Sequence, residues 1–268
     1  SNFLSNEYPY VLSPQGVVLM PVSSATLVER HVAGRVSSGN ETLDGLLGGG
    51  LLRGSCVLLA GPSGAGKSTL AAMFADSACR NGDKVVYISF EQSSQALIEA
   101  MDSVEIPLQP HVEAGRLSVY TAMPESTGAE EHLLRIDRLI DGFEPQHIVV
   151  DAISACPRMG SARAAFDFCV RLLTACKQRG ITCLLINQAL HSEQILQITG
   201  VGISSLVDTL IAMPYEDDGQ GLTRRIIVVK SRGASHSMRY HSFSIVPGGI
   251  EFIEPSQAAE DRTKGGDR

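Results

Sequence analysis

The sequence predicts an α/β fold, with a mainly parallel central sheet, helices on both faces of the sheet and antiparallel hairpins at its C-terminal end. Apolar, β-rich runs alternate along the chain with segments of helical spacing, which is the pattern of parallel strands joined by crossover helices. The last strands follow one another without an intervening helix, which predicts the hairpins. A glycine-rich segment joins the first strand of the alternating region to its first helix.

Each element of this fold is predicted from its own periodicity. The expected strands are short runs rich in Val, Ile and Leu, and the expected helices repeat apolar residues every three to four positions. The predicted strands are residues 56–60, 84–90, 117–120, 147–151, 182–187, 209–213 and 225–230. The predicted helices are residues 69–81, 94–102, 129–143 and 163–179.

The two ends of the chain resemble each other. Residues 10–21 and 243–255 both read as two apolar strands around a Pro-x-Gly turn, which is typical of a hairpin. Chance similarity of two hairpins is one interpretation. The other, which we favour, makes residues 1–21 the last hairpin of a preceding homologous domain, 22–34 a linker, 35–256 the main domain and 257–268 a mobile polar tail.

Composition narrows the class of protein. The 268 residues carry a net charge of −7, which argues mildly against a general nucleic-acid binder. No run of eighteen or more apolar residues is present, so no membrane span is expected. The six cysteines lie mostly inside apolar runs and never as C-x-x-C, which favours reduced core thiols in a cytoplasmic protein.

A phosphate-binding motif stands between the first predicted strand and helix. Gly61-Pro-Ser-Gly-Ala-Gly-Lys-Ser68 fits G-x-x-x-x-G-K-[ST] at every fixed position. Backbone N–H groups of such a loop converge on phosphate oxygens, at the positive end of the following helix. Lys67 is expected to reach the β- and γ-phosphates of ATP, and the Ser68 hydroxyl to bind Mg²⁺. The predicted loop contacts to ATP are Ser63, Gly64, Ala65, Gly66, Lys67, Ser68 and Thr69.

Two carboxylates follow predicted strands. Asp151 closes a buried apolar strand, where a carboxylate is costly unless something positive meets it, so we interpret it as the residue that orients Mg²⁺. Glu91 follows the strand at 84–90, at the sheet edge where α/β proteins bind ligands, and is a candidate general base. The alternatives are a strand-end turn residue for Asp151 and a solvated glutamate before a helix for Glu91.

Four segments carry a family resemblance, namely residues 35–55 before the phosphate loop, 123–133, 143–154 and 230–233. The first resembles the RecA/RadA/KaiC superfamily. The other three narrow the resemblance to the second domain of the KaiC family. The resemblance covers almost the whole chain. It implies a RecA-like P-loop NTPase fold, hexameric rings with Mg-ATP in the clefts between subunits, and ATPase and Ser/Thr autokinase activity in circadian-type timing or related signalling.

The resemblance also assigns catalytic residues. Glu91 matches the catalytic glutamate, thought to act as general base. Lys67, which is expected to reach the phosphates, is also assigned as catalytic. The family has two adjacent glutamates, and Gln92 replaces the second, so a neutral amide stands where a second carboxylate would be. The segment from Lys230 through Arg232 to Gly233 matches residues that reach the γ-phosphate of the neighbouring subunit, where cations stabilise transferred charge. Solvated strand-end charges are the alternative for Lys230 and Arg232.

The phosphate acceptors are assigned in the same way. Ser204 and Ser205 match adjacent serine and threonine phosphosites, and Thr199 a nearby auxiliary threonine. From the residues alone, these hydroxyl groups read as plain turn residues. KaiB-like or KaiA-like regulators are implied as partners, but the tail by which KaiA engages this family is poorly matched after Pro255, which argues against a KaiA-like one.

Two other functions remain open from the sequence. A RecA-like, DNA-dependent ATPase would place cationic loops after Asp151 and after Asn187, but residues 189–204 contain neither Lys nor Arg. A nucleotide-gated scaffold, in which ring assembly is the output and slow hydrolysis is the timer, is not distinguished from the kinase by any residue.

Overall fold

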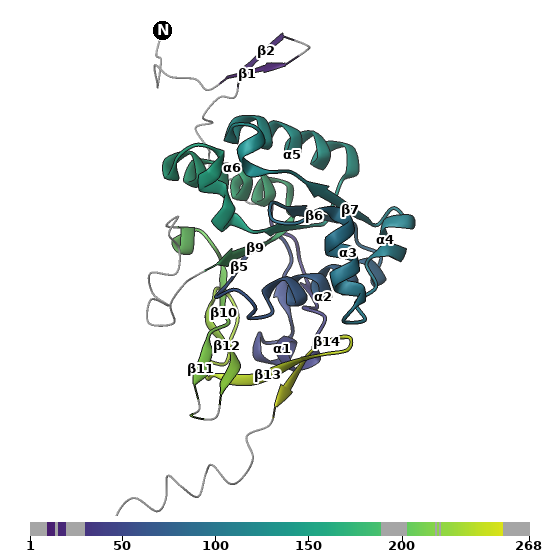
Figure 1. The fold of residues 1–268 in the computed structure, drawn as a ribbon, viewed down its shortest axis with the longest axis vertical. Coiled ribbons are helices and arrows are strands. Elements are labelled where there is room, and N and C mark those ends of the chain that lie inside the picture. Colours follow the sequence, from purple (N-terminus) through teal and green to yellow (C-terminus); the bar gives the residue numbers. More distant parts are fainter. Residues whose placement is uncertain are drawn as a thin grey trace, which may run out of the picture.

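The fold is described from a computed structural model, which places residues 10–13, 16–19, 30–188, 203–217, 219 and 221–253. A ten-stranded sheet runs through the described part of the chain, with helices on both sides (Figure 1). None of the described helices combines the length and the apolar character needed to cross a membrane.

Six neighbouring strands form the parallel part of the sheet. In spatial order they are β10 (Thr209–Ala212), β5 (Cys56–Gly61), β9 (Thr182–Gln188), β8 (His147–Asp151), β6 (Val85–Ser89) and β7 (Leu117–Thr121). Because the strands in the middle are covered on both faces, they are mainly apolar, and β5, β6 and β8 are buried at every position.

Antiparallel strands extend the sheet beyond β10. They are β12 (Leu222–Ser231), β13 (His241–Val246) and β14 (Gly249–Ile253), with β11 (Tyr215–Asp217) paired to β12. A separate short pair joins β3 (Arg35–Val36) to β4 (Leu51–Leu52). The predicted fold class is therefore confirmed, including the antiparallel C-terminal hairpins.

The helices form two layers, one on each face of the sheet (Figure 1). On one face lie α1 (Glu41–Leu46), α2 (Lys67–Arg80), α3 (Ser94–Asp102) and α4 (Gln109–Glu113), and on the other α5 (Ala129–Phe143) and α6 (Ala162–Arg179). Short 3₁₀ helices cover Pro124–Ser126, Ile153–Met159 and Ile203–Ser205. Each layer closes its own apolar cluster against the sheet, and all six cysteines are buried free thiols in these clusters.

Local chemistry sets several helix ends. The side chains of Asn40, Ser93 and Ser161 accept a backbone N–H in the first turn of α1, α3 and α6. Gly180 ends α6 in the left-handed conformation that glycine adopts without strain. The four predicted helices are thus present, each within a few residues of its expected bounds.

The N-terminal segment also contains a hairpin. β1 (Tyr10–Ser13) pairs with β2 (Gly16–Leu19), and Val11 is buried where β1 contacts α5. Most of the predicted linker and the whole predicted tail lie outside the described residues. Whether this hairpin ends a preceding domain stays a prediction.

Candidate functional site

The phosphate loop leads from the buried strand β5 into α2. Gly64 and Gly66 both have positive φ, +76° and +96°, so side chains at these two positions would strain the turn. Gly66 is also the N-cap of α2, which directs the helix N-terminus into the loop. The loop therefore has the backbone conformation that lets N–H groups gather around an anion.

A cavity of about 260 Å³ opens beside this loop. It is lined by the predicted residues Ser63, Gly64, Gly66, Lys67, Ser68, Thr69, Glu91 and Asp151, together with Gln92, Ala152, Ile186, Gln188 and Ile245. Ala65 is buried, and its backbone N–H donates to the Pro62 carbonyl within the loop. The carboxyl ends of β5, β6, β8 and β9 all meet at this cavity, as expected for a parallel sheet.

Lys67 points its ammonium group back onto the loop. Its Nζ donates to the Pro62 carbonyl oxygen at 2.6 Å, and the residue is only 8% exposed. Burial lowers the pKa of Lys67, while the nearby charges of Asp151 and Glu91 oppose that shift. An anionic phosphate is the partner that would offset the buried charge, so the residue fits a triphosphate.

One oxygen of Asp151 accepts hydrogen bonds from two hydroxyl groups. Ser68 Oγ donates to Asp151 Oδ2 at 2.7 Å, and Tyr87 Oη donates to it at 2.9 Å. Burial raises the pKa of Asp151, and these two hydrogen bonds and the Lys67 charge act in the opposite direction. A hydroxyl and a carboxylate side by side, below a phosphate loop, are oxygen donors of the kind that Mg²⁺ prefers.

Glu91 lies at the rim of the same cavity and is exposed. Partial burial raises its pKa, the charge of Asp151 adds to the rise, and the charges of Lys67 and Arg158 reduce it. A raised pKa suits a carboxylate that accepts a proton near neutral pH. The next residue, Gln92, has its backbone held by the Ser89 hydroxyl, which donates to the Gln92 carbonyl and accepts the Gln92 N–H.

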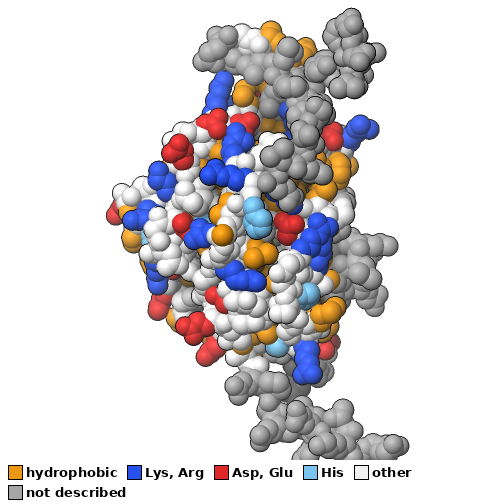
Figure 2. All heavy atoms as spheres, turned by 180° about the vertical axis from the view of Figure 1, so that it is seen from behind, with side chains coloured by type: hydrophobic (Ala, Val, Ile, Leu, Met, Phe, Trp, Pro, Cys, Tyr) orange, Lys and Arg blue, Asp and Glu red, His pale blue; other side chains and the backbone are white. Residues whose placement is uncertain are grey.

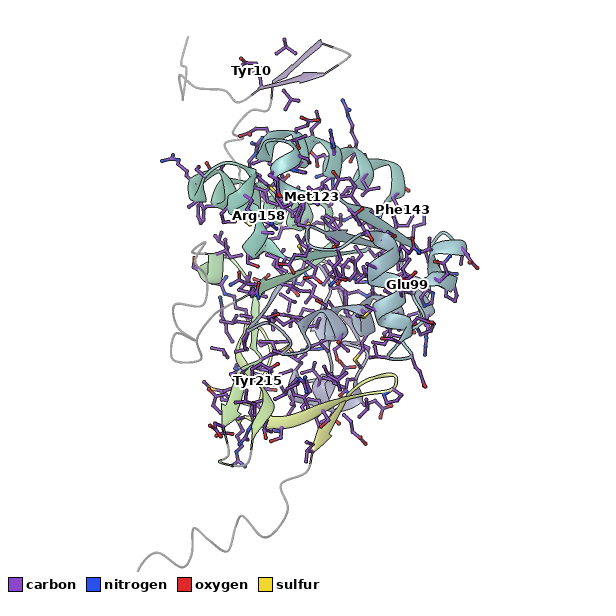
Figure 3. The ribbon with its side chains drawn as sticks, viewed as in Figure 1. Tyr10, Glu99, Met123, Phe143, Arg158 and Tyr215 are labelled. Carbon is purple, nitrogen blue, oxygen red and sulfur yellow. The ribbon has the colours of Figure 1, made fainter. Side chains whose placement is uncertain are left out.

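Two residues that the sequence did not single out brace the phosphate loop from β11 and β12. Tyr215 Oη donates to the Ser63 carbonyl at 3.4 Å, and Arg224 Nε donates to the Gly64 carbonyl at 3.1 Å. The Arg224 guanidinium also lies over the Tyr215 ring, 5.9 Å from its centroid. Figure 3 shows Tyr215 on the antiparallel extension of the sheet. Only the cross-strand register brings these side chains to the loop, so no local motif reveals them.

Lys230 and Arg232 form a second basic cluster with the segment around Ser205. Lys230 Nζ donates to the Val207 carbonyl at 2.6 Å, and Arg232 Nη2 donates to the Ser205 carbonyl at 3.1 Å. Burial and the neighbouring Arg232 lower the pKa of Lys230, and Asp208 opposes the shift. Ser205 is exposed beside these cations.

Asp208 ties this basic cluster to the strand that carries the phosphate loop. Its Oδ2 accepts the backbone N–H of Cys56 at 2.9 Å, at the start of β5. Its Oδ1 lies 3.3 Å from Lys177 Nζ and 3.9 Å from Arg232 Nη1. The cluster therefore carries more positive than negative charge.

In one chain, the basic cluster lies at the amino ends of the central parallel strands, and the phosphate loop lies at their carboxyl ends. Thr209 is paired with both Val57 and Ser231, so Arg232 lies near the start of β5. The loop begins only at Gly61, four residues further along the same strand, which is roughly 13 Å at about 3.3 Å per residue. Lys230 and Arg232 thus lie at the other end of these strands from their own phosphate loop.

Three predicted residues are placed less completely. Gly233 follows Arg232 in a turn with a φ of +71°. The backbone of Ser204 belongs to the same short 3₁₀ helix as Ser205, but its side chain lies outside the described part of the structure. Thr199 lies wholly outside the described residues.

Residues 36–257 match the protein family described as "ATPase: KaiC", which covers the sheet, the phosphate loop and the basic cluster. The chain belongs to the KaiC ATPase family. It is 32% identical over 252 residues to the circadian clock oscillator protein KaiC of Acaryochloris marina (strain MBIC 11017), covering 94% of this chain and 48% of that protein.

Other KaiC relatives give the same picture. Circadian clock protein KaiC2 of Synechocystis sp. (strain ATCC 27184 / PCC 6803 / Kazusa) is 31% identical over 260 residues, which is 95% of this chain and 45% of the relative. KaiC3 of the same strain is 29% identical over 250 residues, 93% of this chain and 50% of the relative. The chain spans about half the length of the curated KaiC relatives that it matches.

Proposed function

We propose that this KaiC-family domain binds and hydrolyses Mg-ATP at the cavity beside the phosphate loop. The observation that carries the proposal is the contact of Ser68 with Asp151 directly below that loop, at 2.7 Å. Lys67 and the loop N–H groups would hold the phosphates, and Ser68 and Asp151 would hold Mg²⁺, which supplies charge neutralisation at the transferred phosphoryl group. Glu91 would accept the proton of the attacking water.

The proposal extends to autophosphorylation in a homohexameric ring. Ser205, Lys230 and Arg232 gather at the amino ends of the parallel strands, whereas the phosphate loop lies at the carboxyl ends. This supports the proposal, because in a ring one protomer's basic cluster can face the next protomer's loop. The Ser204 or Ser205 hydroxyl oxygen forms a bond to the γ-phosphorus while the bond to the ADP oxygen breaks, and Glu91 takes the hydroxyl proton. Thr199 is an auxiliary acceptor.

Two measurements after incubation with Mg-ATP test this function, an assay of released phosphate and a mass spectrum of the protein. We expect phosphate release together with the added mass of one or two phosphoryl groups on the peptide spanning residues 199–209. The Ser204→Ala, Ser205→Ala double variant is expected to keep phosphate release and to lose the added mass, except for any label on Thr199. Labelling of the double variant at a residue other than Thr199 contradicts the acceptor assignment, and an absence of phosphate release from the unaltered chain contradicts the ATPase.

The biological setting is also a proposal. The relatives bear the names of circadian clock proteins, which supports a timing role. KaiB-like or KaiA-like regulators are the partners that the family resemblance implies. The likeness of residues 10–21 to 243–255, and the half-length match to the relatives, support a preceding homologous domain. A coding region without a second phosphate loop upstream would contradict that domain arrangement.

A further inference from the structure

The hydroxyl group of Tyr87 contacts the candidate site at Asp151. Tyr87 lies on β6, is fully buried, and packs its ring into the apolar cluster between the sheet and α2. Phenylalanine would fill the same space. A buried tyrosine hydroxyl needs a hydrogen-bond partner, and here the partner is Asp151 Oδ2 at 2.9 Å.

The strand register directs this hydroxyl to Asp151. β6 and β8 are parallel neighbours, with Tyr87 opposite Val149 and Ser89 opposite Asp151. Since side chains alternate between the two faces of a sheet, Tyr87 and Asp151 project from the same face, two residues apart along the strand direction. The long phenol side chain spans that offset toward the carboxyl ends of the strands, where the phosphate loop lies.

Asp151 is thereby held from two elements at once. Ser68 reaches Oδ2 from the first turn of α2 at 2.7 Å, and Tyr87 reaches the same oxygen from within the sheet. Ser68 belongs to the phosphate loop and is a predicted ligand of the ion, whereas Tyr87 is enclosed in the core. Of the two donors, Tyr87 is the one whose position does not depend on the state of the loop.

We propose that Tyr87 is a positioning residue for the magnesium site, whose hydroxyl holds the Asp151 carboxylate at Oδ2 and so fixes the orientation in which this carboxylate meets the ion and its water. This inference rests on the proposed function, because it takes Asp151 as the carboxylate that orients Mg²⁺. Partners that hold a metal-orienting side chain typically contribute 10- to 100-fold to metal affinity.

The Tyr87→Phe variant of the full chain tests the proposal, because it removes one oxygen atom and keeps the ring. The affinity for ADP is measured in EDTA and during a titration with Mg²⁺. We expect the same affinity in EDTA and a requirement for roughly tenfold more Mg²⁺ to reach half of the affinity gain. Tyr120→Phe is the matched control, because Tyr120 packs against the cluster on the opposite face of the sheet, and it is expected to titrate like the unaltered chain.

Two results would overturn the proposal. One is an unchanged Mg²⁺ titration in Tyr87→Phe. The other is an equal loss of ADP affinity with and without Mg²⁺, which would mark a general packing role. An unaltered chain that gains no ADP affinity from Mg²⁺ would instead contradict the proposed function, and this inference with it.

Discussion

Three ionisable side chains at the phosphate loop counterbalance one another. Burial lowers the pKa of Lys67 and raises the pKa values of Asp151 and Glu91, and the mutual attraction of the opposite charges opposes each of these shifts. The lysine and Asp151 were predictable from the motif and the strand end. Tyr87 was not, because a tyrosine in an apolar strand reads as an ordinary core residue until the neighbouring strand is placed.

The proposed role of Glu91 as general base predicts the pH dependence of hydrolysis. A general base acts when deprotonated, and the raised pKa of Glu91 means that activity is lost at a higher pH on acidification than for an ordinary glutamate. Arg158 lowers this pKa, so Arg158→Ala is expected to move the acidic limb of the kcat/KM profile to still higher pH. The Glu91→Gln variant is expected to lose the limb together with most of the activity, about a hundredfold or more. A limb that stays in place or moves to lower pH in Arg158→Ala contradicts Glu91 as the base.

At the scale of elements, the sheet strands were predictable and their cross-strand contacts were not. The runs in β5, β6, β8 and β9 are apolar in their middle positions, so composition marks them, and their polar residues lie at the strand ends. The six-residue helix α1 and the three-residue strand β11 are too short to show a period. The N-cap residue of α1, Asn40, bonds the distant Ile250 carbonyl, and β11 is paired with the next strand, β12. The contact of Arg224 on β12 with the phosphate loop was not predictable for a similar reason, because it joins residues far apart in the sequence.

This bracing predicts a difference between two adjacent arginines on β12. Arg224 bonds the Gly64 carbonyl in the phosphate loop, whereas Arg225 pairs with Glu216 on β11. Arg224→Ala is expected to weaken nucleotide binding about fivefold to tenfold, since a charge-assisted hydrogen bond that shapes the loop is lost. Arg225→Ala is the matched control and is expected to bind nucleotide normally. Equal affinities for the two variants, measured by titration with a fluorescent ADP analogue, would show that the brace is irrelevant to binding.

At the scale of the whole molecule, the location of the charged groups is more informative than the net charge. The net charge is −7, and Figure 2 shows acidic and basic side chains intermixed on the face it displays. The phosphate loop and the Lys230–Arg232 cluster, by contrast, are separated, because they lie at opposite ends of the central strands. The sequence predicted both groups from motif and resemblance, but their separation depends on the pairing of β10 with β5 and β12, which no local pattern encodes.

Subunit mixing tests the proposed shared site most directly. Lys67→Ala removes the proposed phosphate contact of a protomer and leaves its basic cluster, and the Lys230→Ala, Arg232→Ala double variant does the reverse. Each variant alone is expected to be nearly inactive in phosphate release. Mixed one to one before ATP is added, they should recover roughly a quarter of the unaltered rate, the share of interfaces in a random ring that join an intact loop to an intact cluster. A mixture that is no more active than its two components, although native mass spectrometry shows mixed rings, would contradict the shared site.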